Sequence, residues 1–497
     1  MTSAEALLDL IEREDGHPAL LVPHTGATVS YAQLHEAVAR VAGELAGGGI
    51  EPGDAVAMSF VNGPEMVICF LAIIAAGAGA APLNPAYTSD EFGDYLVDLR
   101  PRAMIVHGGA GEASRSVCAE LDIPLLQATS RVGSDVTVLP DSAPAGLPAR
   151  DPDAIALLLH TSGTTSRPKV VPLRQRNLTS GARAVAATYG LSAEDVSHCV
   201  MPLFHVHGLI ASTLATLSAG GTVLVPPRFS ASAFWPDTVT YGATWYSAVP
   251  TIHGVLTARA ADEPVPASRL RFARSCSSSL PSTLQDEAEE RLGIPLIQAY
   301  GMTEAAHQMA SNPLPPAEHR HGSVGLPTRT EIAVLDDEWR ALGSGEVGEV
   351  AVRGPSVIDA YLDNPEANAS SFRDRWFRTG DLGKLSDDGY LTLEGRIKEM
   401  INRGGEKISP FEVEDALLRH PAVSEAVAYG RPDSKYGEQV AAAVVTVSPV
   451  TEGELQAYCA ERLASFKVPV AIALLDAIPK GPTGKVQRRL MAEVVRR

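Results

Sequence analysis

The amino-acid sequence predicts an α/β protein. We expect a large N-terminal domain of two α/β-sandwich subdomains plus a β-barrel-like subdomain, and a small mobile C-terminal α+β domain. Three observations support this prediction. The chain has 497 residues, which is more than one hydrophobic core usually holds. Apolar helical stretches alternate with short β-branched runs in its first part. The pattern then changes twice, near residue 331 and after residue 396.

The alternation of strands and helices begins early in the chain. Such alternation forms parallel sheets that helices cover on both faces. The expected strands cover residues 55–60, 103–106, 221–225 and 243–248, and the expected helices cover residues 64–76 and 234–241. The apolar run 66–81 is shorter than the roughly 20 residues of a membrane span, so we expect a buried helix there. The Pro- and Ala-rich stretch 139–152 is expected to be an insertion within the large domain.

From residue 331 the sequence becomes rich in strands. Expected strands at 331–335, 348–352 and 391–393 predict the β-barrel-like subdomain. Helices at 412–419 and 454–463 with strands at 423–429 and 440–447 then predict the compact α+β domain. The segment 398–407 between them has two glycines and mixed charges, which suit a mobile hinge. We therefore predict one domain at 1–397 and a second at 398–497.

Charge and cysteine content limit the possible partners. The chain has 59 acidic and 41 basic residues and a net charge of -18, which argues against nucleic-acid and anionic-membrane binding. Any anionic substrate must therefore be held by local cations. The N-terminus shows no secretory leader, and the C-terminus shows no Ser-Lys-Leu-type signal. The five cysteines are scattered without metal-site spacing, which is typical of a reducing compartment. We expect a cytoplasmic protein.

The most informative stretch is His160-Thr-Ser-Gly-Thr-Thr-Ser-Arg-Pro-Lys169, which follows an apolar run typical of a strand. Hydroxyls and backbone N–H groups donate to phosphate oxygens, glycine allows close approach, and the two cations add positive charge. The pattern differs from the P-loop G-x-x-x-x-G-K-[ST]. A hydroxyl-rich surface loop is the alternative. The candidate phosphate contacts are Thr161, Ser162, Gly163, Thr164, Thr165 and Lys169.

Further segments suit an anionic nucleotide. Tyr300 can stack on a base, Thr303 can bond phosphate, and Glu304 can hold Mg²⁺ through oxygen. Asp381, in Thr-Gly-Asp, offers a carboxylate to a vicinal diol such as ribose. Lys485 lies in a Pro/Gly/Thr loop of the small domain, from which a lysine can approach a reacting phosphoryl group. Each string by itself is also typical of an ordinary turn.

Together and in this order, the motifs resemble those of the acyl-adenylate-forming superfamily, which includes acyl-CoA synthetases, adenylation domains and firefly-type luciferases. The resemblance extends over essentially the whole chain. It rests on the loop 161–169, Pro202-Leu-Phe-His205, Tyr300-Gly-Met-Thr-Glu304, Gly348-Glu349, Thr379-Gly-Asp381, Gly395-Arg396 and Gly484-Lys485. It implies that residues 1–397 form an AMP-binding adenylation domain and that residues 398–497 carry the catalytic lysine.

The resemblance also implies two half-reactions. A carboxylate attacks the α-phosphorus of ATP, giving an acyl adenylate and pyrophosphate, and a thiol, usually of coenzyme A, then takes the acyl group. Positioning and charge neutralisation are what phosphoryl transfer needs from a protein. ATP, Mg²⁺ and coenzyme A are the implied cofactors. The implied catalytic residues are Lys485, Glu304, Thr303 and His205. The resemblance further implies that Glu304 and Thr161 would hold the metal and that Asp381, Arg396 and Tyr300 would bind the nucleoside. It also implies that Lys398 would be the hinge and that Gly404 and Gly405 would line the pantetheine tunnel.

The phosphate loop departs from the family pattern at two positions. Ser166 and Val170 stand where the family usually has glycine. Ser166 is a variant found in one branch of the family. Val170 is less expected, because a β-branched residue resists positive φ. We therefore expect an altered backbone where the chain leaves the loop.

The acid-binding segments are polar. His205 stands where amino-acid-activating members have an aspartate, which disfavours an amino acid as substrate. Imidazoles, hydroxyls and an arginine fork suit a second carboxylate. The alternatives are that the histidines cap strand carbonyls, that the arginine pairs with a surface acid, or that His205-x-His207 binds a metal, for which a third ligand is lacking. The candidate substrate contacts are His205, His207, Arg228, Ser277 and His307, beside the polar segment 274–279.

Within the superfamily the chain is most similar to the oxalyl-CoA synthetases. The shared segments include Pro202-Leu-Phe-His-Val-His-Gly208, Arg274-Ser-Cys-Ser277 and Ile401-Asn-Arg-Gly-Gly-Glu-Lys-Ile-Ser-Pro410. In that group Ser277 and His307 match positions that contact oxalate. Malonyl-CoA synthetases share the first segment and Arg228-Phe-Ser230. We therefore expect ATP-dependent activation of a small polar or dicarboxylic acid and its transfer to coenzyme A.

Two alternatives change the function. In one, the adenylate passes to an amine, another nitrogen nucleophile or a carrier-protein thiol. In the other, the protein is a silent nucleotide-binding or regulatory protein. Retention of Lys485, Glu304, Asp381 and Arg396 argues against the second alternative. The expected partners are the acid, ATP and coenzyme A, and the expected oligomeric state is a monomer or homodimer.

Overall fold

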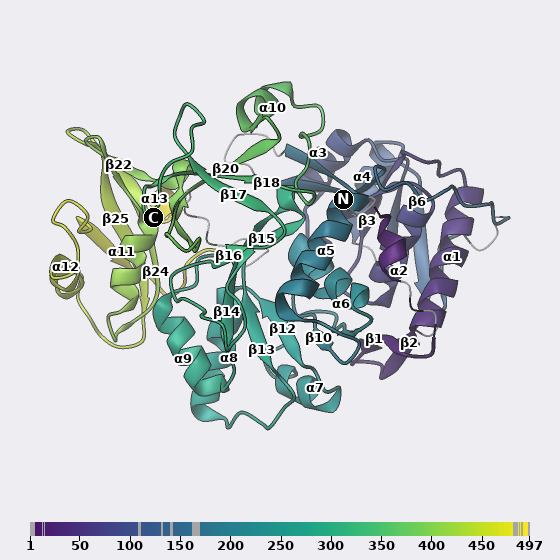
Figure 1. Cartoon of the computed structure of the whole chain (residues 1–497), viewed down its shortest axis with the longest axis horizontal. Helices are drawn as coiled ribbons and strands as arrows, with labels where there is room; N and C mark the ends of the chain where they lie inside the picture. The colour runs from purple at the N-terminus through teal and green to yellow at the C-terminus, as the bar shows by residue number, and fades with distance from the viewer. Residues whose placement is uncertain are drawn as a thin grey trace.

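The computed structural model describes residues 5–11, 13, 15–107, 111–130, 133–139, 143–161, 169–480, 486, 488 and 491–495. Figure 1 shows two large helix-covered sheets side by side, a smaller sheet above their junction, and a separate C-terminal unit at one end. The C-terminal unit lies on the side away from the first sheet.

The first sheet has seven strands in the order β7-β6-β5-β3-β4-β8-β9. Its centre is parallel, and β8 and β9 form an antiparallel hairpin at one edge. The strands are β3 (Ala55–Ser59), β4 (Gly79–Leu83), β5 (Ala103–His107), β6 (Leu125–Ser130), β7 (Val136–Thr137), β8 (Ile155–Thr161) and β9 (Lys169–Arg174), and the helices are α1 (Tyr31–Gly47), α2 (Pro64–Ala75), α3 (Ser89–Leu99) and α4 (Glu112–Glu120).

The second sheet has nine strands in the order β16-β15-β14-β13-β12-β10-β11-β1-β2. It is parallel from β14 to β1 and antiparallel at both ends. The strands are β1 (Pro18–Val22), β2 (Ala27–Ser30), β10 (Val196–His198), β11 (Thr222–Leu224), β12 (Trp245–Ala248), β13 (Phe272–Ser275), β14 (Leu296–Met302), β15 (His307–Ser311) and β16 (Leu326–Pro327). The helices are η1 (Leu7–Leu10), α5 (Gln175–Tyr189), η2 (His207–Leu214), α6 (Ala215–Ser218), α7 (Phe234–Thr240), α8 (Pro250–Asp262), α9 (Ser282–Leu292) and η3 (Thr303–Ala305).

The predicted buried helix of residues 66–81 is a helix followed by a strand. Pro64 begins α2 at a position where its missing N–H costs nothing, and the helix is buried on nearly all sides. Gly77, with φ +82, turns the chain into β4. The prediction was therefore right for α2 and wrong for the last residues of the run. Among the described residues no helix is long and apolar enough to cross a membrane.

The third sheet matches the predicted strand-rich region. Its five antiparallel strands run in the order β17-β18-β20-β19, with β21 paired to β20. They are β17 (Glu331–Leu335), β18 (Gly348–Arg353), β19 (Phe372–Arg373), β20 (Trp376–Leu385) and β21 (Leu391–Arg396), beside helix α10 (Pro365–Ser371). The sheet shares its apolar core with the large domain through residues such as Val350 and Phe377.

The C-terminal unit has its own sheet and its own core. The long antiparallel pair β24–β25 forms its centre, with β22 and β26 on β25 and β23 on β22. Ile401, Val413 and Leu455 belong to a core made only of residues from this unit. Its elements are η4 (Ile397–Glu399), β22 (Ile401–Arg403), β23 (Glu406–Ile408), α11 (Pro410–Leu418), β24 (Val423–Asp433), β25 (Gly437–Thr446), α12 (Glu452–Ala460), β26 (Ala471–Leu474) and α13 (Met491–Val494).

Candidate active site

A buried tyrosine, a carboxylate and an arginine meet where β14 ends beside the β20–β21 hairpin. Asp381 and Arg396 pair across that hairpin, and Arg396 Nε lies 3.0 Å from Asp381 Oδ1. The Tyr300 hydroxyl donates to the other carboxylate oxygen. Burial, with the nearby Asp381 charge, raises the pKa of Tyr300, so the phenol remains a donor. The structure thus brings together three residues that separate motifs assigned to the nucleoside.

The turn that carries Asp381 is held by its neighbours. Thr379 Oγ1 donates to Val350 O at 2.8 Å and accepts from Asp381 N at 3.1 Å. Gly380 has φ +76, a conformation that favours glycine, and its N–H donates to Glu349 Oε1 at 3.1 Å. The Thr-Gly-Asp string is therefore a fixed bend that presents a carboxylate.

A second cluster forms around Glu304, which lies in η3 directly after β14 and is 6% exposed. Tyr361 Oη donates to Glu304 Oε1 at 2.9 Å, and Lys169 Nζ lies 4.4 Å from the centre of the Tyr361 ring. Burial raises the pKa of Glu304 and lowers the pKa of Lys169, although the two charges attract each other. Thr303, the first residue of η3, adjoins the cluster. An oxygen ligand and a cation thus share a partly dry site, which suits phosphate groups and a divalent metal.

Both ends of the predicted phosphate loop reach this cluster. Thr161 ends β8, Lys169 begins β9, and the two residues pair across the hairpin. The predicted contacts Ser162, Gly163, Thr164 and Thr165 lie outside the described residues. A hairpin that opens at a buried carboxylate and a lysine is a suitable frame for a pyrophosphate-binding loop.

Val170 does not show the expected distortion. It continues β9 opposite His160, is 7% exposed, and packs in a cluster with Leu158. It is not among the non-glycine residues with positive φ. A β-branched side chain suits the extended backbone of a strand, so nothing strains the chain at this residue.

A third polar cluster, which includes three of the predicted acid contacts, is organised around Arg274 of β13, which is fully buried. Its Nη1 donates to Ser247 Oγ at 2.9 Å, and its Nη2 lies 3.0 Å from Gln308 Oε1 and 3.3 Å from His307 Nδ1. Its Nε donates to Tyr189 Oη at 2.9 Å, and burial raises the pKa of Tyr189, so the phenol is neutral. Among the described residues no carboxylate is hydrogen-bonded or ion-paired to this guanidinium. Buried charges are normally paired, so the positive field here favours an anion.

A chain of hydrogen bonds runs from Arg274 to the partly exposed Ser277. Ser247 Oγ accepts from Arg274, so its single proton is available for His207 Nε2 at 2.6 Å. Neutral His207 then carries its proton on Nδ1 and donates to Ser277 Oγ at 3.0 Å. The Ser277 proton is left to point outward, and Ser277 is the one partly exposed member of this chain. The guanidinium therefore makes Ser277 a hydrogen-bond donor.

His307 lies beside this chain in an unusual backbone conformation. Ala306 and His307 have φ +47 and +89, which residues with side chains rarely adopt. The register of β14 and β15 shifts at Gly301, where a Cβ would overlap the carbonyl oxygen of His307. Since a guanidinium only donates, the contact from Arg274 leaves the proton of neutral His307 on Nε2. The imidazole ring centres of His207 and His307 lie 4.9 Å apart. A strained strand pair thus supplies a second donor group.

The other two predicted acid contacts lie differently. His205 is partly exposed, two residues before His207, which begins the π-helix η2. Arg228 is exposed on the loop after β11, where it lines a small cavity with His198 and Asp237. It makes no hydrogen bond to His207, Ser277 or His307 in the described part of the chain. The buried arginine is therefore Arg274, which the sequence indicated only as part of the segment 274–279.

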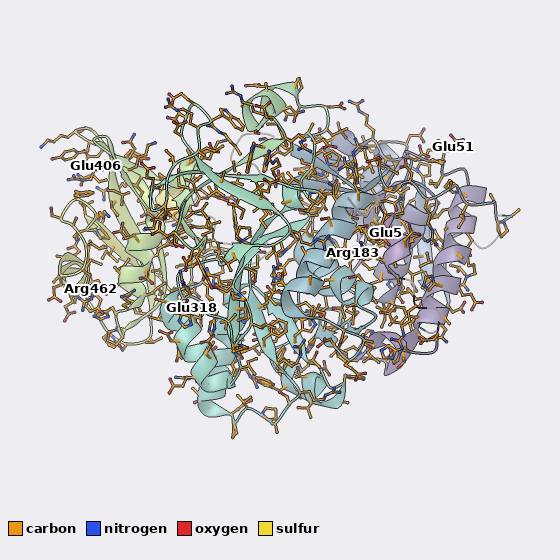
Figure 2. The ribbon with its side chains drawn as sticks, in the orientation of Figure 1. Glu5, Glu51, Arg183, Glu318, Glu406 and Arg462 are labelled. Atoms are coloured by element: carbon orange, nitrogen blue, oxygen red, sulfur yellow. The ribbon has the colours of Figure 1, made fainter. Side chains whose placement is uncertain are left out.

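The predicted hinge and tunnel residues lie on opposite sides of the small domain. Burial is the largest cause of the lowered pKa of Lys169, and the positive charge of Lys398, in η4, lowers this pKa further. The two ammonium groups are therefore near enough to repel each other. Gly404 and Gly405 form the exposed turn between β22 and β23. Glu406, the next residue, lies at the outer edge of the molecule in Figure 2, far from the large domain. Lys485 lies outside the described residues.

Arg488 attaches the last part of the chain to the hinge. It is ion-paired with Glu414 of α11, its Nε lies 3.1 Å from Glu399 Oε2 in η4, and its Nη1 donates to Ala428 O at 2.6 Å. Arg488, three residues after the predicted catalytic lysine in the sequence, thus lies beside η4.

The fold and the comparisons with known proteins identify an ATP-dependent acid–thiol ligase of the AMP-forming class. The chain belongs to the AMP-binding enzyme family: that family matches residues 9–362, and the AMP-binding enzyme C-terminal domain matches residues 412–485. The predicted α/β architecture with a small C-terminal domain is confirmed. The boundary between residues 397 and 398 stays a prediction.

Known relatives agree with this class. A probable CoA ligase of Humulus lupulus is 48% identical, over 94% of this chain and 91% of its own length. An oxalate–CoA ligase of Arabidopsis thaliana is 47% identical, over 94% and 93%. The structure of o-succinylbenzoate–CoA synthetase from Bacillus subtilis with ATP and magnesium superposes with a TM-score of 0.85, at 30% identity, over 97% of this chain and 98% of that chain. ATP and coenzyme A are substrates of these ligases, as predicted.

Proposed function

We propose that this enzyme activates oxalate, or a dicarboxylate of similar size, to an acyl adenylate and transfers it to coenzyme A. The proposal rests on the fully buried Arg274, whose described hydrogen-bond partners are all neutral. A short dianion in the pocket brings a second carboxylate next to that charge. The Arabidopsis thaliana relative, an oxalate–CoA ligase, supports the same substrate.

The acid is held by hydrogen-bond donors that are oriented by Arg274. Ser277 Oγ and His307 Nε2 donate to the carboxylate that does not react. Arg274 is a positioning residue, because its Nη1 and Nη2 contact Ser247 and His307 and so orient them. Donors that already point into the site need no reorganisation when the anion arrives. His205, which is partly exposed and two residues before His207, is proposed to contact the reacting carboxylate.

The nucleotide is held on the other side of the site. Asp381 and Arg396 bind the ribose, Tyr300 closes the adenine side, and Thr303 donates to the α-phosphate. Thr161, Lys169 and the loop between them hold the β- and γ-phosphates. Glu304 and Thr161 would hold Mg²⁺, which supplies charge neutralisation at the phosphates; the buried carboxylate of Glu304 fits that role.

Transfer to coenzyme A requires the small domain to turn. Gly404 and Gly405 are proposed to line the pantetheine tunnel, yet their turn lies at the far edge of the molecule. Rotation about Lys398 exchanges the face that carries Lys485 for the face that carries the two glycines. We propose on the same grounds a mobile domain of residues 398–497. We further propose a cytoplasmic enzyme, a monomer or homodimer; its five cysteines are all buried and free.

Pyrophosphate exchange with oxalate, malonate, acetate and benzoate tests the substrate. Oxalate is expected to support the fastest exchange, and Ser277→Ala is expected to raise its KM by at least about tenfold while the KM for ATP stays the same. Ser278→Ala, at the exposed neighbouring serine, is the matched control. A preference for monocarboxylates would overturn the proposal. Exchange without CoA-dependent AMP release would show that another nucleophile takes the acyl group.

Measuring the two half-reactions separately tests the role of Lys485. Because a lysine that bridges the acid and the α-phosphate acts only in adenylation, Lys485→Ala is expected to abolish pyrophosphate exchange. The same variant should still release coenzyme A thioester from supplied acyl adenylate. An equal loss of both half-reactions would contradict this role.

A further inference from the structure

Outside the site already described, two histidines and a glutamate converge on one point. Glu289 lies on α9, and His319 and His321 lie on the loop between β15 and β16. Their ligand atoms all lie within 4.8 Å of one another. His319 Nε2 is 3.2 Å from Glu289 Oε1, and His321 Nε2 is 3.3 Å from Glu289 Oε2. The three side chains are 22%, 22% and 31% exposed, so the point is accessible but sheltered.

We propose that this cluster is a binding site for a divalent transition metal of the Zn²⁺ type. A tetrahedral ion with bonds of about 2.0–2.1 Å has its ligand atoms roughly 3.3 Å apart. His319 Nε2 lies 3.2 Å from Glu289 Oε1, His321 Nε2 lies 3.3 Å from Glu289 Oε2, and the ligand atoms all fall within 4.8 Å, so small side-chain adjustments bring them to that separation. Two imidazoles and one carboxylate suit Zn²⁺, whereas Mg²⁺ and Ca²⁺ prefer oxygen ligands alone. Three protein ligands leave the fourth position to water.

A second carboxylate orients one of the imidazoles. His321 Nδ1 lies 2.7 Å from Asp286 Oδ1, on the preceding turn of α9. Histidines that bind metals usually donate their other ring N–H to a carboxylate in this way. When Nδ1 carries that proton, the lone pair of Nε2 faces a Glu289 oxygen, and the two repel unless a cation lies between them. A metal ion between the two atoms removes this repulsion.

The loop that carries the histidines is held in place from its other side. Arg320 N donates to Asn312 Oδ1 at 2.8 Å, and the Arg320 guanidinium lies over the Tyr390 ring and donates to Asp388 at 3.0 Å. Tyr390 Oη donates to Glu318 O at 2.6 Å. Glu318, labelled in Figure 2, lies beside the end of the large domain that faces the C-terminal unit. Alternate residues of a fixed loop therefore present both imidazoles to α9, and binding a metal orders little that is not ordered already.

Zinc titration of the tag-free, chelator-treated full-length enzyme, read by a competing metal dye, tests the site. One Zn²⁺ is expected to bind with submicromolar affinity and to raise Tm. His321→Asn should weaken binding at least about a hundredfold, and Asp286→Asn about ten- to a hundredfold. His24→Asn, at an exposed histidine elsewhere, is the matched control.

A second variant distinguishes this metal from the one in the reaction. Zinc bound at the histidine cluster is retained in Glu304→Gln and lost in His321→Asn, and an anomalous X-ray signal at the zinc edge lies between Glu289 and His319. Equal zinc binding by His321→Asn and His24→Asn would overturn the proposal. Loss of the bound zinc in Glu304→Gln alone would overturn it too, by placing the ion at the nucleotide site.

Discussion

At the scale of single residues, the proposed function depends on the buried guanidinium of Arg274, which orients the groups proposed to bind the acid. Arg274→Met removes the charge and leaves Ser247, Gln308 and His307 without their donor. We expect a loss of about 2 kcal/mol in acid binding, or roughly thirtyfold in KM for oxalate, with the KM for ATP unchanged. Steady-state pyrophosphate exchange measures both constants.

Two further variants serve as controls for this prediction. Arg274→Lys keeps the positive charge but loses the forked guanidinium group. Its KM for oxalate should therefore lie between those of wild type and Arg274→Met. Arg228→Met decides between the two arginines that the sequence offered, because Arg228 is exposed and makes none of these contacts. A larger effect on the KM for oxalate from Arg228→Met than from Arg274→Met would place the second carboxylate at Arg228 instead.

A buried histidine makes stability depend on pH. His253 of α8 is fully buried, and burial lowers its pKa to about 4 from the ordinary 6.5. Between these values the unfolded chain binds more protons than the folded chain, so this stabilisation is complete above pH 6.5 and is lost as the pH falls toward 4. The difference between these two pKa values corresponds to roughly 3 kcal/mol in the free energy of unfolding. Urea unfolding at pH 7 and at pH 4 measures the loss in the free energy of unfolding between these two pH values. We expect this loss to be roughly 3 kcal/mol smaller in His253→Gln than in wild type. An equal loss in the two proteins would contradict the assignment.

The sequence indicated the residue types of the site better than their partners. Tyr300, Asp381 and Arg396 were predicted from separate motifs, and they do meet. The role of Arg274 could not be predicted, because its partners come from α5, β12 and β15. Nothing local distinguishes a buried arginine from an exposed one such as Arg228. The cluster at Glu289, His319 and His321 was missed for the same reason: its third ligand is on a different element.

At the scale of elements, the close approach of β14 to β15 positions His307. Gly301→Ala places a Cβ on the carbonyl oxygen of His307, and backbone cannot move aside as a flexible side chain can. We expect a loss of about 2–4 kcal/mol in the free energy of unfolding and a raised KM for oxalate. Urea unfolding and exchange kinetics measure these two effects.

Gly254 provides the matched control for that substitution. It lies within α8, where a Cβ would first meet Leu284 at 4.0 Å. Gly254→Ala is therefore expected to leave the KM for oxalate unchanged and to stabilise the enzyme by up to about 1 kcal/mol. A loss of stability in Gly254→Ala as large as in Gly301→Ala would mean that the effect does not come from the strand contact.

Elements were also the scale at which sequence reasoning worked best. Strands at residues 331–335 and 348–353 match their predicted bounds within one residue, because alternation and turn residues act locally. The run 66–81 was assigned to one helix because α2 is almost entirely buried, β4 is fully buried, and both share the same apolar composition. Only the left-handed turn at Gly77 separates them.

At the scale of the whole molecule, Arg488 ties the end of the chain to the hinge. Arg488→Met leaves Glu414 as a buried carboxylate without its cation, which costs about 3–5 kcal/mol. We expect the small domain to unfold at lower urea concentration, and pyrophosphate exchange to fall more than thiolysis of supplied acyl adenylate. Arg462→Met, on the surface of the same domain in Figure 2, should change stability by less than about 0.5 kcal/mol. Equal loss of both half-reactions would show that Arg488 serves stability alone.

In the proposed function, the hydrogen-bond chain from Arg274 to Ser277 separates the residue that determines the substrate preference from the residues that touch the substrate. A relative with the same Ser247, His207 and Ser277 but an acceptor in place of Arg274 would reverse every bond in the chain. Its serine would then accept from the substrate, in a pocket of the same shape. Substrate preference can therefore diverge among relatives whose pocket linings are identical, and comparison of lining residues alone would not detect the change.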